Sequence, residues 1–448
     1  MKRLKKSAGP AFHQWFGGCP ILTLVFLLGL GCVSLSYASN YYVAKNGQDT
    51  NPGTLDRPFL TISKAAKVAK AGDTVFVRAG TYRERIIPSY SGTSSAYITF
   101  QNYGGEQVIV DASGLAQGFI LYGVSYVKIK GFAIKNSKRS CIHIHDHKDV
   151  PDRGSDHIII EGNTVQNCGI DGYNGIYIGG RNNLVSDNDV SHNGYSFIGM
   201  APGHGIYVFG DGNSVRNNRV YSNARQGVRM QGNGNVISEN RIWQNGEYGI
   251  AIWVDAPGSA NRTSITKNLI NENRRGGIRI WGEGSGGKPD TVYIYSNTIS
   301  NGSARDALYA TGGAKNIKVK NNIVEGNFTN VILGVENSTE GYEEDNNLFY
   351  GSGWYVFGTG YYRTYEDYRS RSGQGGQSLN DRDPFLESDF TLNAASPAID
   401  EGTYIGFPFS GLAPDLGAFE SNYTNELAAP TPTTTTNHAT AKKRGLRK

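Results

Sequence analysis

Cysteine is scarce in this chain of 448 residues, which contains four. Cys19 and Cys32 fall in the first 38 residues, so an exported and processed chain would keep Cys141 and Cys168. Two cysteines allow one disulfide in an oxidising compartment, and they exclude a fold built on a disulfide framework. The sequence leaves open whether Cys141 and Cys168 are joined.

A second long apolar segment is also missing. The one apolar run, Ile21–Val33, follows a basic start and precedes small residues that end at Ala38. That order is typical of a secretory signal peptide, which we predict over residues 1–38, and the run is short for a membrane span. We therefore expect an exported protein that is secreted, periplasmic or held at the cell surface, with a retained N-terminal anchor as the alternative.

The body of the chain lacks an excess of charge of either sign. The net charge is +5; removing four positive charges in the leader and a net four in residues 421–448 leaves −3 for residues 39–420. This balance argues against a nucleic-acid-binding domain. Residues 421–448 are rich in Pro and Thr and end in basic residues, which predicts a disordered tail that could contact a membrane or an anionic cell surface.

A short repeat rich in Asn and Gly fills most of the chain. Each repeat has an Asn, a short strand of alternating apolar residues, a second Asn four or five residues later and a strand of the form GIxI. A period of about 20 to 35 residues indicates stacked units that share one core. The first Asn recurs as Asn163, Asn188, Asn218, Asn240, Asn268, Asn297 and Asn322, and the second as Asn167, Asn193, Asn223, Asn245, Asn273, Asn301 and Asn327.

The repeats predict an all-β fold, a single-stranded right-handed parallel β-helix, over residues 39–420. Strands that alternate apolar and polar residues bury one face, and equivalent asparagines of stacked coils can hydrogen-bond along the stack. We expect the only amphipathic helix over Thr61–Ala71, where it would cap the first coil. A non-repetitive segment from Tyr361 onward would form an irregular cap at the other end, and we expect one domain and a monomer.

Two stretches flank these coils. The N-terminal one is YYVAKNGQDTNPGTLDRPFLTISKAAKVAKAGDTVFVRAGTYRE, and the closing ones are DPFLESDFTLNAASPAIDEG and PDLGAFE. With them the chain resembles the secreted bacterial right-handed parallel β-helix proteins related to pectate and other polysaccharide lyases. The resemblance extends from Tyr41 to about Glu420 and implies this fold together with action on a polysaccharide.

One outward face of the GIxI strands is expected to bind the ligand. The second and fourth residues of the motif are apolar and should point inward, so the third and fifth should point outward. Aromatic rings stack on sugar faces and guanidinium groups pair with uronate carboxylates, which predicts an acidic polysaccharide as the partner of a stripe from His143 to Tyr309. The expected substrate contacts are Tyr177, Phe209, Gln231, Trp253, Trp281 and Tyr309.

β-Elimination of a uronate chain is the reaction that this stripe favours. It needs a neutralised carboxylate, a base for the C5 proton and a proton for the leaving oxygen. Arg229 and Arg279 could neutralise the carboxylate, and Tyr207, His204 or an arginine could be the base. A uronan C5-epimerase would begin with the same proton abstraction. A glycoside hydrolase and a non-catalytic polysaccharide-binding solenoid are further alternatives.

His204 lies in the motif GHG, where its neighbours in register should be Asn174, Gln226, Tyr248 and Gly276. The motif resembles that of the β-helical polygalacturonases, whose His assists a trio of Asp carboxylates. Here the paired Asp expected about one coil upstream is absent, so hydrolysis lacks its acid and base.

Candidate metal ligands are few. The calcium-dependent pectate lyases of this fold use an Asp cluster and a Lys base, but the acids of the central coils are scattered in turns: Asp187, Asp189 and Asp211. The resemblance allows calcium, and the sequence assigns no residues to it. His143 and His145, two apart on one strand face, could present two ligands to a zinc-type ion, with His147 or Asp149 nearby.

Overall fold

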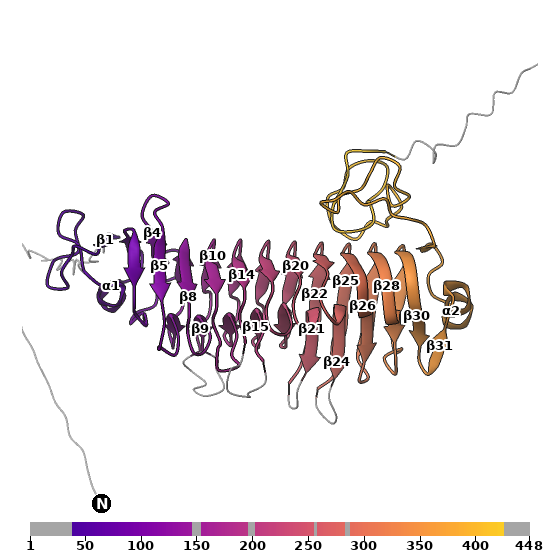
Figure 1. Cartoon of the computed structure of the whole chain (residues 1–448), viewed down its shortest axis with the longest axis horizontal. Coiled ribbons are helices and arrows are strands. Elements are labelled where there is room, and N and C mark those ends of the chain that lie inside the picture. The colour runs from indigo at the N-terminus through magenta and orange to yellow at the C-terminus, as the bar shows by residue number, and fades with distance from the viewer. Residues whose placement is uncertain (1–37, 146–153, 196–201, 255–257, 283–286, 425–448) are drawn as a thin grey trace, which may run out of the picture. The chain divides into compact units, whose positions relative to one another are not determined.

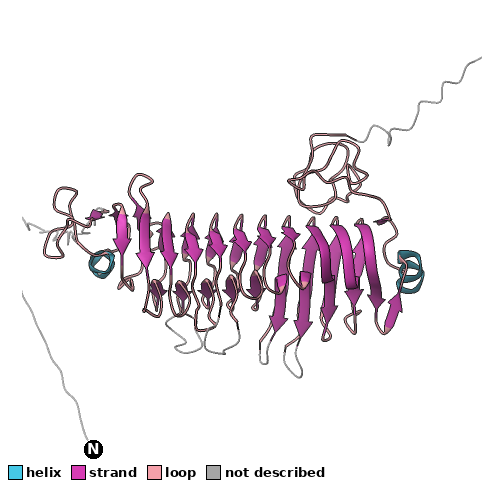
Figure 2. Cartoon of the chain, in the orientation of Figure 1, coloured by secondary structure: helices cyan, strands magenta, loops and turns pink. Residues whose placement is uncertain are grey.

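The strands of each repeat pair in parallel with the equivalent strands of the coils before and after, so the chain forms a parallel β-helix. The computed structural model describes residues 38–145, 154–195, 202–254, 258–282 and 287–424. These residues belong to one unit that starts at Ala38. Figure 1 shows its strands following one another along the helix axis, and Figure 2 shows the two helices among them. Residues 1–37 of the predicted signal peptide and residues 425–448 of the predicted tail lie outside the described residues.

The first sheet has 12 strands within the described residues. In order along the sheet they are β1 (Asn40–Val43), β2 (Thr74–Val77), β4 (Ile98–Asn102), β7 (Val127–Lys130), β10 (Ile159–Glu161), β13 (Leu184–Ser186), β16 (Ser214–Arg216), β19 (Val236–Ser238), β22 (Asn261–Thr266), β25 (Asp290–Tyr295), β27 (Lys315–Lys320) and β29 (Glu343–Asp345).

The second sheet consists of two rows of strands that merge near its C-terminal end. One row contains β3 (Gly80–Tyr82), β5 (Val108–Asp111), β8 (Phe132–Lys135), β11 (Thr164–Gln166), β14 (Asp189–Ser191), β17 (Arg219–Tyr221), β20 (Arg241–Trp243) and β23 (Leu269–Asn271). The other row, here called the GIxI row, contains β6 (Phe119–Leu121), β9 (Ile142–Ile144), β12 (Ile176–Ile178), β15 (Ile206–Val208), β18 (Val228–Met230), β21 (Tyr248–Val254) and β24 (Gly276–Gly282). The long strands β26 (Thr298–Thr311), β28 (Ile323–Val335) and β30 (Leu348–Phe357) run through both rows, and β31 (Gly360–Tyr362) and β32 (Leu379–Asn380) follow.

The core fills the space between the sheets. The predicted inward residues of the GIxI row have no solvent exposure: Ile176, Ile178, Ile206, Val208, Val228, Met230, Ile250, Ile252, Ile278 and Ile280. Burial of one apolar side chain from every second position in every coil stabilises the stack, at about 1.5–3 kcal/mol for a side chain of this size. The alternation predicted from the sequence is therefore confirmed.

A ladder of buried asparagines runs along one corner of the β-helix and confirms the first Asn row. The backbone N–H and the Nδ2 of Asn218 both donate to Oδ1 of Asn240, each at 2.9 Å. The same Nδ2 also donates to the carbonyl oxygens of Val185 and Arg216. Each amide thus supplies partners for the corners of its own coil, the coil before and the coil after. The ladder comprises Asn163, Asn188, Asn218, Asn240, Asn268, Asn297, Asn322 and Asn347.

The second Asn row is confirmed only in its middle. Its hydrogen-bonded members are Asn193, Asn223, Asn245 and Asn273. Asn167 was wrongly placed in this row: it adopts the left-handed corner conformation, with φ 56°, and Cys168 takes the ladder position by donating its N–H to Asn193. Asn327 is exposed and accepts a hydrogen bond from Ser352, and the side chain of Asn301 lies outside the description.

The glycine that opens each GIxI strand is required by this second row. A Cβ atom on Gly205 would lie 2.7 Å from Nδ2 of Asn223, and one on Gly227 would lie 2.8 Å from Nδ2 of Asn245. A close-packed interior does not accommodate such contacts without movement. The Asn and the Gly of the repeat therefore depend on each other, which explains why they recur together.

Cys168 forms a disulfide with Cys141, 27 residues earlier in the chain. Both cysteines are buried in the core of the β-helix. The bond joins one corner to the start of a GIxI strand, and closing a loop of this length is worth about 3.5 kcal/mol in the chain-entropy account. The question that the sequence left open is answered, and the bond fits an oxidising compartment.

Helices close both ends of the core. The predicted N-terminal helix is confirmed as α1 (Ile62–Val68), capped by the Thr61 side chain and buried through Ile62, Ala65 and Ala66. A second helix, α2 (Tyr365–Ser372), was not expected, because its sequence is polar apart from two buried tyrosines. Residues 381–424 are irregular as expected, with turns and an isolated bridge. They do not cover the last coil as predicted: Ala418 donates its N–H to Thr298 at 2.9 Å and the Arg241 guanidinium lies over the Phe419 ring, so this segment packs along the side of earlier coils. No helix in the described ranges has the length and apolar character that a membrane span needs.

Glu344 is a buried carboxyl group inside this C-terminal cap, with 2% of its surface exposed. Its Oε1 accepts hydrogen bonds from Asn347 at 2.8 Å and Ser378 at 2.5 Å, and its Oε2 accepts one from Tyr365 at 3.1 Å. Burial raises the pKa of the Glu344 carboxyl from 4.5 to about 7, although the hydrogen bonds oppose the rise. Between a pH of about 4.5 and about 7, the Glu344 carboxyl is therefore protonated in the folded protein and ionised in the unfolded chain.

We expect this proton to make stability fall as pH rises. Between a pH of about 4.5 and about 7 the native state binds more protons than the unfolded state, so the free energy of unfolding decreases, by at most about 3 kcal/mol in total. Glu344→Gln keeps an oxygen acceptor and cannot ionise, so it should remove this slope in urea unfolding between about pH 5 and pH 8. The exposed Glu340→Gln is the matched control and should keep the slope. A wild-type slope that persists in Glu344→Gln would contradict the assignment.

Candidate functional site

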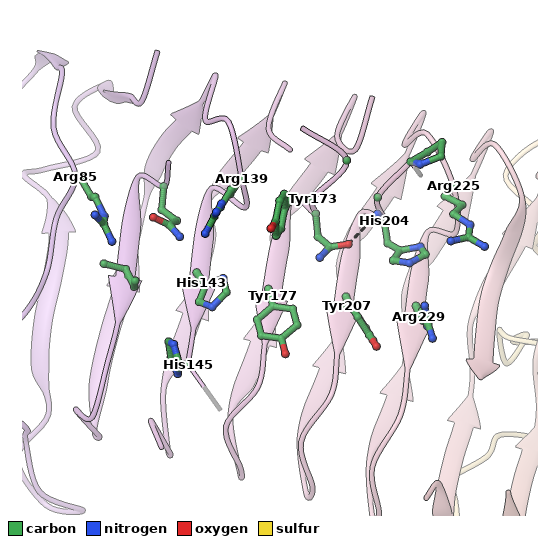
Figure 3. Close-up of a pocket in the computed structure, with 16 residues that line it drawn as sticks. Arg85, Arg139, His143, His145, Tyr173, Tyr177, His204, Tyr207, Arg225 and Arg229 are labelled. Carbon is green, nitrogen blue, oxygen red and sulfur yellow. Dashed lines mark hydrogen bonds between the residues drawn. The ribbon is translucent and has the colours of Figure 1, made fainter. Parts of the chain in front are cut away.

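A cavity of about 610 Å³ opens on the outward face of the GIxI row, across strands β9, β12, β15 and β18 (Figure 3). Four arginines line it: Arg85, Arg139, Arg225 and Arg229. No Asp or Glu is among the described residues that line it. A concave site with four guanidinium groups and no lining carboxylate favours an anionic ligand.

Strand register brings the outward side chains of the cavity into line. Tyr177 pairs with His143 on one side and with Tyr207 on the other, and Tyr207 pairs with Arg229. All four side chains are half-buried and line the cavity, as does His145. Tyr177 stacks on the His143 ring, with centroids 4.7 Å apart, and meets Tyr207 edge to face at 5.6 Å. The structure thus unites five of the predicted site residues.

His204 lies beside this line, just before the strand glycine. Its carbonyl accepts from Gly175, and its own N–H donates to Oδ1 of Asn174 at 2.9 Å, so it occupies the expected register. Its side chain is 4% exposed and meets Tyr207 edge to face, with centroids 5.5 Å apart. Its Nδ1 is buried without a hydrogen-bond partner in the described part of the chain. A buried unpaired nitrogen that lines a cavity is available to a polar ligand.

The His204 imidazole is held in its neutral form. Burial lowers its pKa well below 6.5, and the positive charges of Arg229 and Arg225 lower it further, while Gln226 opposes them. A neutral imidazole has a nitrogen lone pair, so it can accept a proton at neutral pH.

The arginines on the His204 side are fixed by aromatic and acidic neighbours. The Arg229 guanidinium lies over the rings of Tyr207 and Trp253, 4.8 and 5.4 Å from their centroids. The Nε of Arg225 is 3.2 Å from Oε2 of Glu247, which holds this side chain against the corner. Stacked and paired guanidinium groups lose less freedom on binding an anion. On the other side of the cavity, Arg139 lies over Tyr173 at 5.1 Å.

The rest of the predicted stripe lies outside the cavity. Phe209, Gln231, Trp253 and Trp281 continue the outward line, and the two tryptophan rings are 4.1 Å apart. Gln231 is buried, with 3% exposure. Arg279 lies two coils beyond Arg229, and its Nη1 is 4.0 Å from Oδ2 of the buried Asp306.

The structure also covers the last residue of the predicted stripe. Tyr309 is 5% exposed and packs with Val331, Val356 and Trp354 of β28 and β30. Its hydroxyl donates to Oε2 of Glu336 at 2.5 Å. The open part of the face therefore ends before Tyr309, and the cavity ends at Arg225 and Arg229.

The predicted histidine pair lies at β9, with His143 within the strand and His145 directly after it. The rings of His143 and His145 are 5.6 Å apart, and His145 also meets Tyr122 edge to face at 4.6 Å. Among the described residues, no group of three or more His, Cys, Asp or Glu side chains could hold a metal ion. His147 and Asp149, named with the pair as further ligands, lie outside the described residues.

Sequence reasoning missed the cavity residues that come from turns. Four lining residues occupy one position of the repeat, directly before the register of Ser140, Asn174, His204 and Gln226. They are Arg139, Tyr173, Gly203 and Arg225. Aligning the repeats on this position instead of on the strand would have shown the set. Arg85 and Gln117 come from the first coils, where the repeat is weak and no spacing indicates them.

The fold resembles that of several solved structures. Pectate lyase Pel9A superposes with a TM-score of 0.62 at 21% identity, over 86% of this chain and 96% of that one. XylC in complex with xylose superposes with a TM-score of 0.50 at 17% identity, over 70% of this chain and 76% of that one. Identities this low show a shared fold and do not transfer an activity.

Matching sequences extend the comparison. The uncharacterized Bacillus subtilis protein YwoF is 32% identical over 152 residues, which are 33% of this chain and 27% of that protein. Pectate lyase PEL9 of Emericella nidulans is 40% identical over 80 residues, 17% of this chain and 20% of that protein. The chain thus matches about a quarter of the length of these curated relatives. Residues 41–348 match the family model for the Pel9A-like right-handed β-helix region. The chain therefore belongs to the Pel9A-like right-handed β-helix family, with the handedness expected from its repeats.

Proposed function

We propose that this protein is an exported lyase that binds an acidic polysaccharide in the four-arginine cavity and cleaves it by β-elimination. The observation that carries the proposal is the lining of the cavity, which contains four arginines, three histidines and three tyrosines. No described Asp or Glu side chain is part of this lining. Uronate chains offer such a site carboxylates for the arginines and sugar faces for the rings. The pectate lyases Pel9A and PEL9 among the similar proteins support this class of substrate.

In the proposed reaction His204 is the base and Tyr207 the proton donor. The neutral imidazole takes the proton from C5 of the uronate, and the electrons of that bond form the C4–C5 double bond. The C4–O glycosidic bond breaks, and its oxygen takes a proton from the Tyr207 hydroxyl. The two rings meet edge to face, so both groups can reach one sugar residue.

Arg229 and Arg225 would stabilise the charge that develops in this step. Removal of the C5 proton places negative charge on the carboxylate that is conjugated with C5, and donors fixed beforehand stabilise such charge without reorganising. Both arginines lie close enough to His204 for their charges to lower its pKa. One pair of side chains would therefore bind the substrate carboxylate and keep the base deprotonated.

A product assay tests the proposal. The exported chain, without residues 1–38, is incubated with pectate, alginate or a glycosaminoglycan while the ultraviolet absorbance of an unsaturated uronate is followed. We expect a rise with one of these polymers and its loss in His204→Ala. Binding without any rise would overturn the lyase chemistry. An assay of solvent-proton exchange at C5 would then distinguish a C5-epimerase from a non-catalytic polysaccharide-binding solenoid.

A further inference from the structure

The described cavity does not suit a calcium ion. Calcium takes six to eight oxygen ligands, usually with several carboxylates among them. No Asp or Glu lines the described cavity, and the guanidinium groups on its walls would repel a divalent cation. Elsewhere in the described residues, the acids do not gather into a group of three that could hold a metal. The calcium that the family resemblance allowed therefore has no donor set among the residues that the structure describes.

Four arginines are distributed along the cavity instead. In Figure 3, Arg85 lies at one end, Arg139 lies between Arg85 and Tyr173, and Arg225 and Arg229 lie at the other end, next to His204. Glu247 pairs with Arg225 and lies 3.8 Å from Arg275, and it also accepts a hydrogen bond from Gln226. Glu247 does not line the cavity, so the described lining has an excess of positive charge.

Two cavity residues between Arg85 and Arg225 carry buried polar atoms. Gln117 and His204 line the cavity, and Oε1 of Gln117 and Nδ1 of His204 are buried without a hydrogen-bond partner in the described chain. Gln117 and His204 are in register three coils apart, through Ser140 and Asn174, so they are separated by about 14 Å. Sugar hydroxyls of a chain several residues long could satisfy both atoms while its carboxylates meet the arginines.

We infer that these arginines bind the uronate carboxylates directly, so that the protein holds an acidic oligosaccharide without a divalent cation. The inference rests on the proposed function, since it concerns the same cavity and substrate class. Guanidinium forks bind carboxylates with two parallel hydrogen bonds, which supplies the neutralisation that calcium supplies in the calcium-dependent pectate lyases.

Calorimetric titration of size-defined oligogalacturonates and oligomannuronates tests the inference, with the full exported chain in EGTA or in CaCl₂. One of the oligouronides should bind with the same Kd in both buffers, within about twofold, and more weakly as NaCl increases. Arg139→Ala, on the side of the cavity away from His204, should weaken binding by at least about tenfold. The exposed Arg216→Ala, which removes the same charge from the first sheet, should leave binding unchanged.

The outcomes separate the inference from the proposed function. Binding that needs added calcium overturns the inference and leaves the proposed function intact. Calcium-free binding without product supports the inference and overturns only the lyase chemistry. If no oligouronide binds in either buffer and no polymer yields product, the proposed function itself is overturned. Neutralising the acids of the undescribed segment 146–153 (Asp146→Asn, Asp149→Asn, Asp152→Asn) should not change calcium-free binding, and a loss would also count against the arginines.

Discussion

Replacing Arg229 with alanine should lower the rate of elimination by about 100-fold or more, the usual cost of removing one donor that stabilises transition-state charge. The guanidinium is half-buried and lies over the rings of Tyr207 and Trp253, which hold it beside His204 before the substrate binds. Because the negative charge grows as the C5 proton leaves, the loss should appear mainly in kcat. Arg229→Lys should recover part of the rate, since it keeps the charge but loses the fork.

Arg216→Ala is the matched control for this prediction. Arg216 ends β16 on the first sheet and is exposed, so its removal changes the net charge equally and should change kcat by less than about twofold. Arg279→Ala should also have a smaller effect than Arg229→Ala, because Arg279 faces Tyr309 and Asp306 instead of the cavity. If both variants are folded and Arg229→Ala is as fast as Arg216→Ala, the reaction does not take place in the cavity.

The repeats predicted the frame of the site because its spacing is fixed by backbone geometry. In a parallel stack, equivalent residues lie one above another, so the alternation in GIYIGG, GIYVFG and GVRMQG sufficed to align Tyr177, Tyr207 and Arg229. The asparagine ladder followed from the same periodicity. His204 also fell at its expected register, next to Asn174 and Gln226.

The limits of the site were not predictable, because they depend on departures from the repeat. Strands β26, β28 and β30 shift register between neighbours, and these irregularities bring Val331 and Trp354 over Tyr309. Nothing in the local sequence of Tyr309 distinguishes it from the half-buried Tyr177. Turn residues such as Arg225 carry no strand alternation that would indicate their direction, and turns commonly carry the functional residues of a rigid scaffold.

The second Asn row links stability to the site. Asn223 and Asn245 fix the corner that precedes Arg225, Gln226 and Glu247, and their amides pack against the strand glycines. His204 and the residues in register with it therefore follow corners whose backbone groups are hydrogen-bonded. Such corners can present an unpaired atom such as His204 Nδ1 without losing the local structure.

Asn240→Asp should be the most destabilising conservative change in the ladder, with a loss of about 4 kcal/mol or more in the free energy of unfolding. Asn240 is 1% exposed, and its Nδ2 donates to the carbonyls of Val215 and Ser238 and to Oδ1 of Asn268, each at 2.9 Å. A carboxylate would place a charged acceptor against three oxygen acceptors. Asn240→Ala only removes the donors and should cost about 2–3 kcal/mol.

Urea unfolding as a function of pH distinguishes this charge effect from a general disturbance of the corner. Repulsion and burial should raise the pKa of the carboxyl group that Asn240→Asp introduces, so protonation at low pH restores a donor, and the stability gap to the wild type should narrow as pH falls. The gap for Asn240→Ala should not change with pH. Asn327→Asp is the matched control, because Asn327 is exposed in β28 and should change stability by less than about 0.5 kcal/mol. If Asn240→Asp costs no more than Asn327→Asp, the buried ladder is not a principal source of the stability of the stack.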